Sequence, residues 1–103
     1  MALLIEQEVE DGVVVLRLRG DLDVHTKEEL QARLEELLDQ GAETIRLDLT
    51  DVDYIGSVAI AVMVGVSKRL VRKGGRLLVR PGSKETRRHF GLLNLDTLLD
   101  IEG

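Results

Sequence analysis

A single serine stands where the chain changes from acidic to strongly apolar, and its position marks a candidate site for negative charge. Residues 45–65 read IRLDLTDVDYIGSVAIAVMVG, with Asp51 and Asp53 before Ser57 and an apolar run after it. If that run is a helix, the first backbone N–H groups beside Ser57 lack intrahelical partners and favour an anion. Ser57 is therefore a candidate phosphorylation site, and serine is equally a good helix cap. The two roles are compatible, because a capping serine already lies at the anion site.

The neighbours of Ser57 do not favour catalysis. An activated serine needs a base beside it, and the chain has neither a G-x-S-x-G turn nor a histidine near Ser57 in sequence. Asp21 and Asp23 could be imagined as an acid–base pair. Because they follow a predicted strand, turn contacts to backbone N–H groups are the better interpretation. We expect that the protein is not an enzyme; a small enzyme using Asp21, Asp23 or Asp53 with Ser57 is the weaker alternative.

The composition argues against several other functions. The chain has no cysteine, and His25 and His89 lie far apart in sequence, so we expect neither a metal site nor a cofactor. Tyr54 and Phe90 are the only aromatic residues, too few for base stacking on nucleic acid. The N-terminus lacks the basic segment of a signal peptide, and the longest apolar run, Val58–Val66, is too short to span a bilayer. We expect a cytoplasmic protein without nucleic-acid binding or membrane insertion.

Hydrophobic periodicity places Ser57 and the aspartates among strands and helices. Asp11-Gly12 between two apolar runs predicts a hairpin, and Gly20-Asp21-Leu22-Asp23 is expected to end its second strand. Thr26 and Glu29 form a T-x-x-E capping box that would open a helix, which Gly41 would end. The predicted segments are strands at Leu3–Val9 and Val13–Arg19, a helix between Thr26 and Gly41, and a strand at Thr44–Leu49.

The segment after Ser57 is the ambiguous one. Its valines and isoleucines would suit a buried strand. However, it continues to a Gly74-Gly75 stop, which is long for a strand, and its end is basic, as a helix C-terminus prefers. Apolar residues also recur at every fourth position from Val58 to Leu70, so we predict a helix. The remaining predicted segments are a strand at Arg76–Arg80, a helix from Ser83 to about Leu92, and a tail, Leu93–Ile101, docked as a short helix or an edge strand.

This order of elements predicts a mixed sheet. Strand–helix–strand alternation from residue 13 onward gives parallel pairing with right-handed crossovers, and the initial hairpin adds an antiparallel edge. We predict an α/β fold with four to five strands and helices packed on the sheet, in a single domain of residues 1–103. Basic residues gather in the second half of the chain. We interpret them as a solvated helix face, with a surface for an acidic partner as the alternative.

Several of these features together resemble a known family. The Gly20-Asp21-Leu22-Asp23 turn, the LDLTDVDYI segment and the serine that opens the central helix resemble the STAS domain, above all the bacterial anti-sigma factor antagonists. The resemblance covers essentially the whole chain. The family motif Asp-Ser-Ser/Ala-Gly-Leu corresponds here to residues 56–60, Gly-Ser-Val-Ala-Ile. Gly56 therefore replaces an aspartate, either because the turn needs an unusual backbone angle or because the loss changes how a kinase engages the serine.

The resemblance implies a partner switch. The unphosphorylated protein would bind an anti-sigma factor that is also a serine kinase, phosphorylation of Ser57 would release it, and a separate serine phosphatase would restore the hydroxyl. The alternative within the same family is a scaffold that is not phosphorylated, or a subunit of a larger regulatory or transport complex. The partner-binding surface implied by the resemblance consists of Asp21, Asp23, Gly56, Ser57 and Val58.

Overall fold

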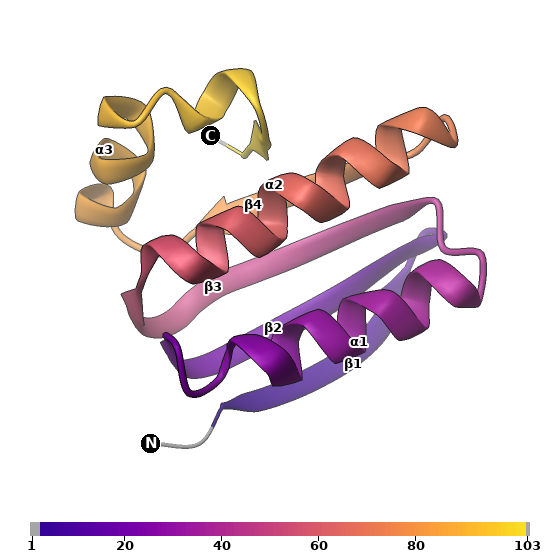
Figure 1. Ribbon diagram of the computed structural model, residues 1–103, viewed down its shortest axis with the longest axis horizontal. Coiled ribbons are helices and arrows are strands. Elements are labelled where there is room, and N and C mark those ends of the chain that lie inside the picture. Colours follow the sequence, from indigo (N-terminus) through magenta and orange to yellow (C-terminus); the bar gives the residue numbers. More distant parts are fainter. Residues whose placement is uncertain (1–2, 103) are drawn as a thin grey trace.

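The computed structural model describes residues 3–102 as a five-stranded sheet with two long helices across one face (Figure 1). The strands lie side by side in chain order; β1 is antiparallel to β2, and the other neighbours are parallel. The strands are β1 Leu4–Glu10, β2 Val13–Leu22, β3 Thr44–Ile55, β4 Arg76–Pro81 and β5 Asp100–Ile101. The helices are α1 Lys27–Asp39, α2 Ser57–Arg72, α3 Lys84–Leu92 and the short 3₁₀ helix η1 Leu95–Thr97. The predicted mixed α/β sheet with its N-terminal hairpin is confirmed.

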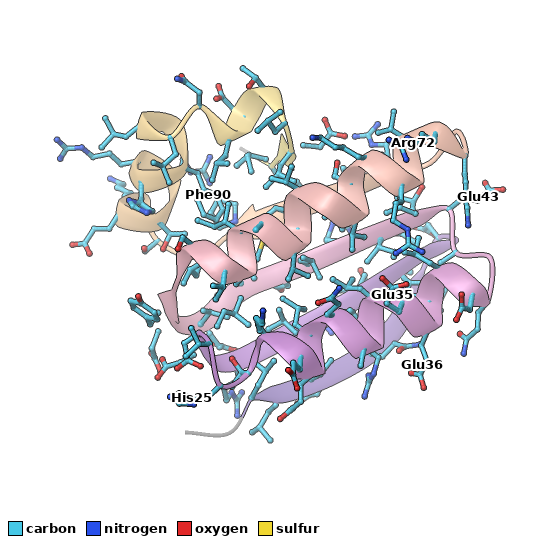
Figure 2. The ribbon with its side chains drawn as sticks, viewed as in Figure 1. His25, Glu35, Glu36, Glu43, Arg72 and Phe90 are labelled. Atoms are coloured by element: carbon cyan, nitrogen blue, oxygen red, sulfur yellow. The ribbon has the colours of Figure 1, made fainter. Side chains whose placement is uncertain are left out.

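One face of the sheet is apolar because alternate residues of its inner strands are aliphatic. Leu16 and Leu18 of β2 and Leu47 and Leu49 of β3 are at most 1% exposed. Helices α1 and α2 lie next to each other over this face, and α3 and η1 lie on the far side of α2 from α1 (Figure 1). Phe90 of α3 is also fully buried in this core (Figure 2).

The ambiguous segment after Ser57 is a helix, as predicted. Its buried residues recur every three or four positions, which gives α2 one apolar stripe against the sheet. The helix ends at Arg72, Lys73 is its C-cap, and Gly74 follows with a φ of +82°, a left-handed conformation that glycine adopts at low cost. The buried residues of α2 are Ala59, Ile60, Met63, Val66, Ser67 and Leu70.

Strands β2 and β3 both continue beyond their predicted ends. β2 does not stop at Arg19 but continues to Leu22, and β3 does not stop at Leu49 but continues through the acidic segment to Ile55. The two extensions pair with each other, with register irregularities on either side of Gly20, whose φ is +114°. Strand β4 pairs with β3 only as far as Leu49, so residues 20–22 and 52–55 form a two-stranded extension of the sheet, the β2–β3 ribbon. This ribbon leads directly into Ser57.

The predicted helix ends and C-terminal tail had mixed outcomes. The Thr26 side chain makes no capping hydrogen bond to α1, so the predicted capping box is wrong. Gly41 follows α1 with a φ of +84°, and the Ser83 side chain accepts a hydrogen bond from the Thr86 amide at the start of α3, both as predicted. The tail forms both of the expected structures, η1 and the edge strand β5.

The opposite face of the sheet carries charged residues in cross-strand rows. Glu6, Arg17, Asp48 and Arg80 are successive register neighbours across β1 to β4. Asp48 Oδ2 lies 3.7 Å from Arg17 Nε and 4.0 Å from Arg80 Nη1. Burial alone would raise the pKa of Asp48, but hydrogen bonds from the Thr50 hydroxyl and amide, together with Arg80 and Arg17, lower that pKa below its ordinary value. Asp48 thus belongs to this charged face and lies away from the site at Ser57.

The basic residues of the second half also take part in ion pairs. Arg69 of α2 forms an ion pair with Glu35 of α1, and Glu35 lies on the side of α1 that faces α2 (Figure 2). Arg76 Nε lies 3.3 Å from Asp100 Oδ2, which joins β4 to β5. These contacts place Arg69 and Arg76 in ion pairs within the fold.

Candidate functional site

Ser57 is the first residue of α2, and its side chain is exposed to solvent. The N-cap is Gly56, whose carbonyl accepts hydrogen bonds from the amides of Ala59 and Ile60. The Ser57 hydroxyl makes no hydrogen bond within residues 3–102, so the interpretation of Ser57 as a helix cap is wrong. Because the first amides of a helix have no intrahelical acceptors, this hydroxyl lies beside donors that favour a negative group.

Gly56 is buried and tightly held at the junction between β3 and α2. Its amide donates a hydrogen bond of 2.7 Å to the Leu22 carbonyl, which ties the end of β2 to the start of α2. Its φ of −89° and ψ of 164° are ordinary for any residue, so the interpretation that this turn needs an unusual backbone angle is wrong. A Cβ at this position would lie 3.3 Å from Tyr54 Cε2 and 3.4 Å from the Leu22 carbonyl oxygen. Glycine differs from other residues at this position because it avoids these close contacts, and not because of its backbone angles.

The turn before α1 is organised by Asp23 and Thr26. Asp23 Oδ1 accepts hydrogen bonds from the amides of His25 (2.9 Å) and Thr26 (3.2 Å). The hydrogen bond from the His25 amide is the largest influence on the pKa of Asp23; burial opposes it, and the net effect lowers that pKa. The Thr26 hydroxyl donates to the Asp21 carbonyl at 2.6 Å and accepts from the Asp23 amide. The turn interpretation is confirmed for the Asp23 carboxylate, while Asp21 contributes its backbone carbonyl.

These two junctions enclose a shallow hollow of about 280 Å³ beside Ser57. Four of the five predicted partner-binding residues line it: Asp23, Gly56, Ser57 and Val58. The fifth, Asp21, lies opposite Tyr54 in the register of the β2–β3 ribbon and does not line the hollow.

Sequence reasoning missed three residues that line the same hollow: Val24, His25 and Tyr54. Val24 lies between Asp23 and His25, and Tyr54 follows Asp53. An apolar or aromatic residue beside charged residues was the sequence signal that could have indicated an exposed contact. His25 lies in the turn just before α1 (Figure 2). It shares the hollow with Ser57, yet no hydrogen bond within residues 3–102 joins its ring to that hydroxyl. The arrangement therefore lacks the serine–base contact of an activated nucleophile.

The charge around the hollow is negative. Asp23 lines it directly, Asp21 lies on the adjoining ribbon, and Asp53 is exposed on β3 just before it. Asp51 lies earlier in β3, farther from Ser57, and its Oδ2 atom lies 3.7 Å from Arg19 Nη2. Within residues 3–102, no group of three or more histidine, aspartate or glutamate side chains could hold a metal ion. The same residues include no helix that is both long and apolar enough to cross a membrane.

Comparison with known proteins identifies the fold and its relatives. A family model for the STAS domain matches residues 5–102. The chain belongs to the STAS domain family. It is 29% identical over 101 residues to the anti-sigma-B factor antagonist of Bacillus subtilis (strain 168), an alignment that covers 98% of this chain and 92% of that protein.

Solved structures of STAS proteins have the same architecture. The crystal structure of an anti-sigma factor antagonist from Mycobacterium paratuberculosis superposes with a TM-score of 0.86 at 24% identity, over 96% of this chain and 84% of that one. The Bacillus cell fate determinant SpoIIAA in its phosphorylated form superposes with a TM-score of 0.73 at 25% identity, over 97% of this chain and 92% of that one. The STAS relatives of this chain thus include regulatory proteins named for antagonising anti-sigma factors, and one of them has been solved in a phosphorylated state.

Proposed function

We propose that this STAS protein is an anti-sigma factor antagonist that binds an anti-sigma factor with serine kinase activity and is released when Ser57 is phosphorylated. In that step the γ-phosphoryl group of ATP would pass to Ser57 Oγ, which loses its proton, and a separate serine phosphatase would restore the hydroxyl. The proposed partner-binding surface consists of Asp21, Asp23, Gly56, Ser57 and Val58.

The observation that carries the proposal is the position of the Ser57 hydroxyl. It is exposed at the first residue of α2, and it makes no hydrogen bond within the described chain. A kinase can therefore reach it without opening the fold. The names of the relatives, which are anti-sigma factor antagonists, and the phosphorylated SpoIIAA structure support the assignment of this serine as a switch.

The electrostatics of the site give phosphorylation a physical consequence. A phosphate adds roughly −1.5 to −2 charges at neutral pH. Within the protein, the amides at the start of α2 tolerate that charge. In a complex the same charge would be desolvated close to the carboxylate of Asp23 and to Asp21 on the adjoining ribbon, where repulsion and lost hydration both oppose binding. The fold should survive phosphorylation, and the complex should dissociate.

The proposal is tested with purified kinase-type anti-sigma factors encoded in the same genome, each mixed with the protein and ATP. Phosphate is located by mass spectrometry, with Ser57→Ala as the matched control, and affinity is measured by calorimetry for the unmodified and phosphorylated proteins. We expect one phosphate at Ser57, none on the alanine variant, and at least tenfold weaker binding after modification, since a tenfold loss corresponds to about 1.4 kcal/mol. Equal affinity of the two forms would refute the switch.

A constitutive STAS scaffold is the competing function, and one observation favours it. Gly56 stands where the family motif has an aspartate, and the ring of Tyr54 lies too close to admit a side chain there without moving. Stable binding of the anti-sigma factor with no incorporation of phosphate at Ser57 would support the scaffold and exclude the switch.

A further inference from the structure

Two large apolar side chains are exposed to solvent beside Ser57. Val24 and Tyr54 are 61% and 56% exposed, and both line the hollow that contains Ser57. Val24 belongs to the turn before α1 and Tyr54 to the end of β3, so two junctions distant in sequence bring them to one place. Val71 and Leu92 are similarly exposed but do not line this hollow. Tyrosine is among the residue types enriched at interface anchors, and the exposed valine beside it extends the apolar patch.

The Tyr54 ring and the glycine at position 56 fit together as a pair. The backbone at Gly56 is ordinary, but a Cβ there would lie 3.3 Å from Tyr54 Cε2 and 3.5 Å from the Tyr54 hydroxyl oxygen. A side chain at 56 would therefore press on the ring, which would have to shift by a few tenths of an ångström.

The charge around these side chains restricts the partner. Asp23 lines the hollow and Asp21 lies opposite Tyr54 on the adjoining ribbon, so the apolar pair has acidic residues beside it. Such residues repel nucleic acid and anionic membrane surfaces and favour a protein with complementary positive charge.

We infer that Val24 and Tyr54 anchor the partner to this site and select an anti-sigma factor with an apolar pocket and a basic rim beside the position that receives Ser57. The inference rests on the proposed function and deepens it, because it names the residues that supply affinity and specificity.

The test measures the dissociation constant of the purified anti-sigma factor for surface variants. Tyr54→Ala is expected to weaken binding about tenfold or more, as loss of a central aromatic anchor does. Val24→Ser should weaken it about tenfold, the equivalent of one buried valine. The matched control is Val71→Ser, because Val71 is also 61% exposed but lies about 21 Å along α2 from Ser57. The dissociation constant of Val71→Ser should stay within about twofold of the wild-type value. Melting curves should show that all variants fold.

A second substitution tests the pairing of Tyr54 with position 56. Gly56→Asp restores the residue of the family motif, yet its Cβ would displace the Tyr54 ring. If Tyr54 is the anchor, Gly56→Asp weakens binding, and adding it to Tyr54→Ala causes little further loss, since both remove the same contact. Tighter binding by Gly56→Asp would overturn the inference.

The remaining outcomes separate this inference from the proposed function. If Val24→Ser and Tyr54→Ala bind as tightly as wild type while phosphorylation at Ser57 still releases the partner, the inference is wrong and the proposed function stands. If the two variants bind weakly but phosphorylation changes nothing, the anchors are supported and the switch is refuted. If the unmodified protein binds no purified anti-sigma factor, both are overturned.

Discussion

Replacing Ser57 with alanine should leave the free energy of unfolding almost unchanged, whereas the same replacement at Ser83 should lower it. Ser83 is the N-cap of α3, and its side chain accepts a hydrogen bond of 3.1 Å from the Thr86 amide. Losing such a cap costs about 1 kcal/mol, which lowers the melting temperature of a domain of this size by about 4–8 °C. Ser57 is exposed and makes no hydrogen bond within the described chain, so its loss should cost less than about 0.5 kcal/mol.

The comparison is made by urea unfolding at neutral pH, followed by circular dichroism, on wild type and the two variants. The dependence of unfolding free energy on urea should be the same in all three proteins, so that midpoints can be compared directly. Phosphorylated wild type belongs in the same series, and we expect it to be as stable as the unmodified protein or slightly more so, by about 0.3–1 kcal/mol. If Ser57→Ala is as destabilising as Ser83→Ala, the hydroxyl caps α2. If phosphorylation lowers stability by more than about 1 kcal/mol, the helix start does not accommodate the charge.

Three further predictions concern the scaffold. Asp48→Asn should lower the unfolding free energy by about 1.5–3 kcal/mol at neutral pH. Because the fold lowers the pKa of Asp48, the stabilisation by its carboxylate is present above the ordinary value of 3.8 and is lost as pH falls through the folded pKa. The difference in unfolding free energy between wild type and Asp48→Asn, measured by urea unfolding, should therefore be smaller at pH 3 than at pH 7, and a constant difference would contradict this. Gly65→Ala should raise the melting temperature, since a Cβ there meets nothing within 4 Å and alanine favours helix by about 1 kcal/mol. Gly75→Ala should lower the melting temperature, since its Cβ would clash with the Glu43 carbonyl. Equal changes in melting temperature for the two variants would contradict the packing described for these glycines. Phe90→Ala should cost about 3–5 kcal/mol by chemical denaturation, and a loss below about 1 kcal/mol would place this side chain outside the core.

The sequence predicted the elements better than their ends. Period and turn chemistry located the strands β1 to β4 and the helices α1 to α3, because those signals reflect which face is buried, whereas the tail was left open between a short helix and an edge strand. The extensions of β2 and β3 were missed because Gly20 and the acidic residues 51–53 are weak strand formers when taken alone. They are strands only because each extension pairs with the other, and that contact joins residues about thirty positions apart.

At the site, residue chemistry located Ser57 and the role of Asp23 but missed spatial neighbours. Thr26 matched a capping box, yet its hydroxyl bonds to the Asp21 carbonyl instead, because the turn folds back on the end of β2. Gly56 suggested an unusual backbone angle, whereas its backbone angles are ordinary and the Tyr54 ring and the Leu22 carbonyl approach it closely. Both errors concern contacts that a local pattern does not encode.

The β2–β3 ribbon has a mechanical consequence. Residues 52–55 have a strand neighbour on one side only, and the Gly56 amide is held by a single bond to Leu22 at the tip of that ribbon. This tip should open at a lower free-energy cost than the centre of β3, which has a strand on each side. Deuterium uptake at the Gly56 amide should therefore be faster than in the centre of β3, and a docked protein that clamps both junctions should slow it.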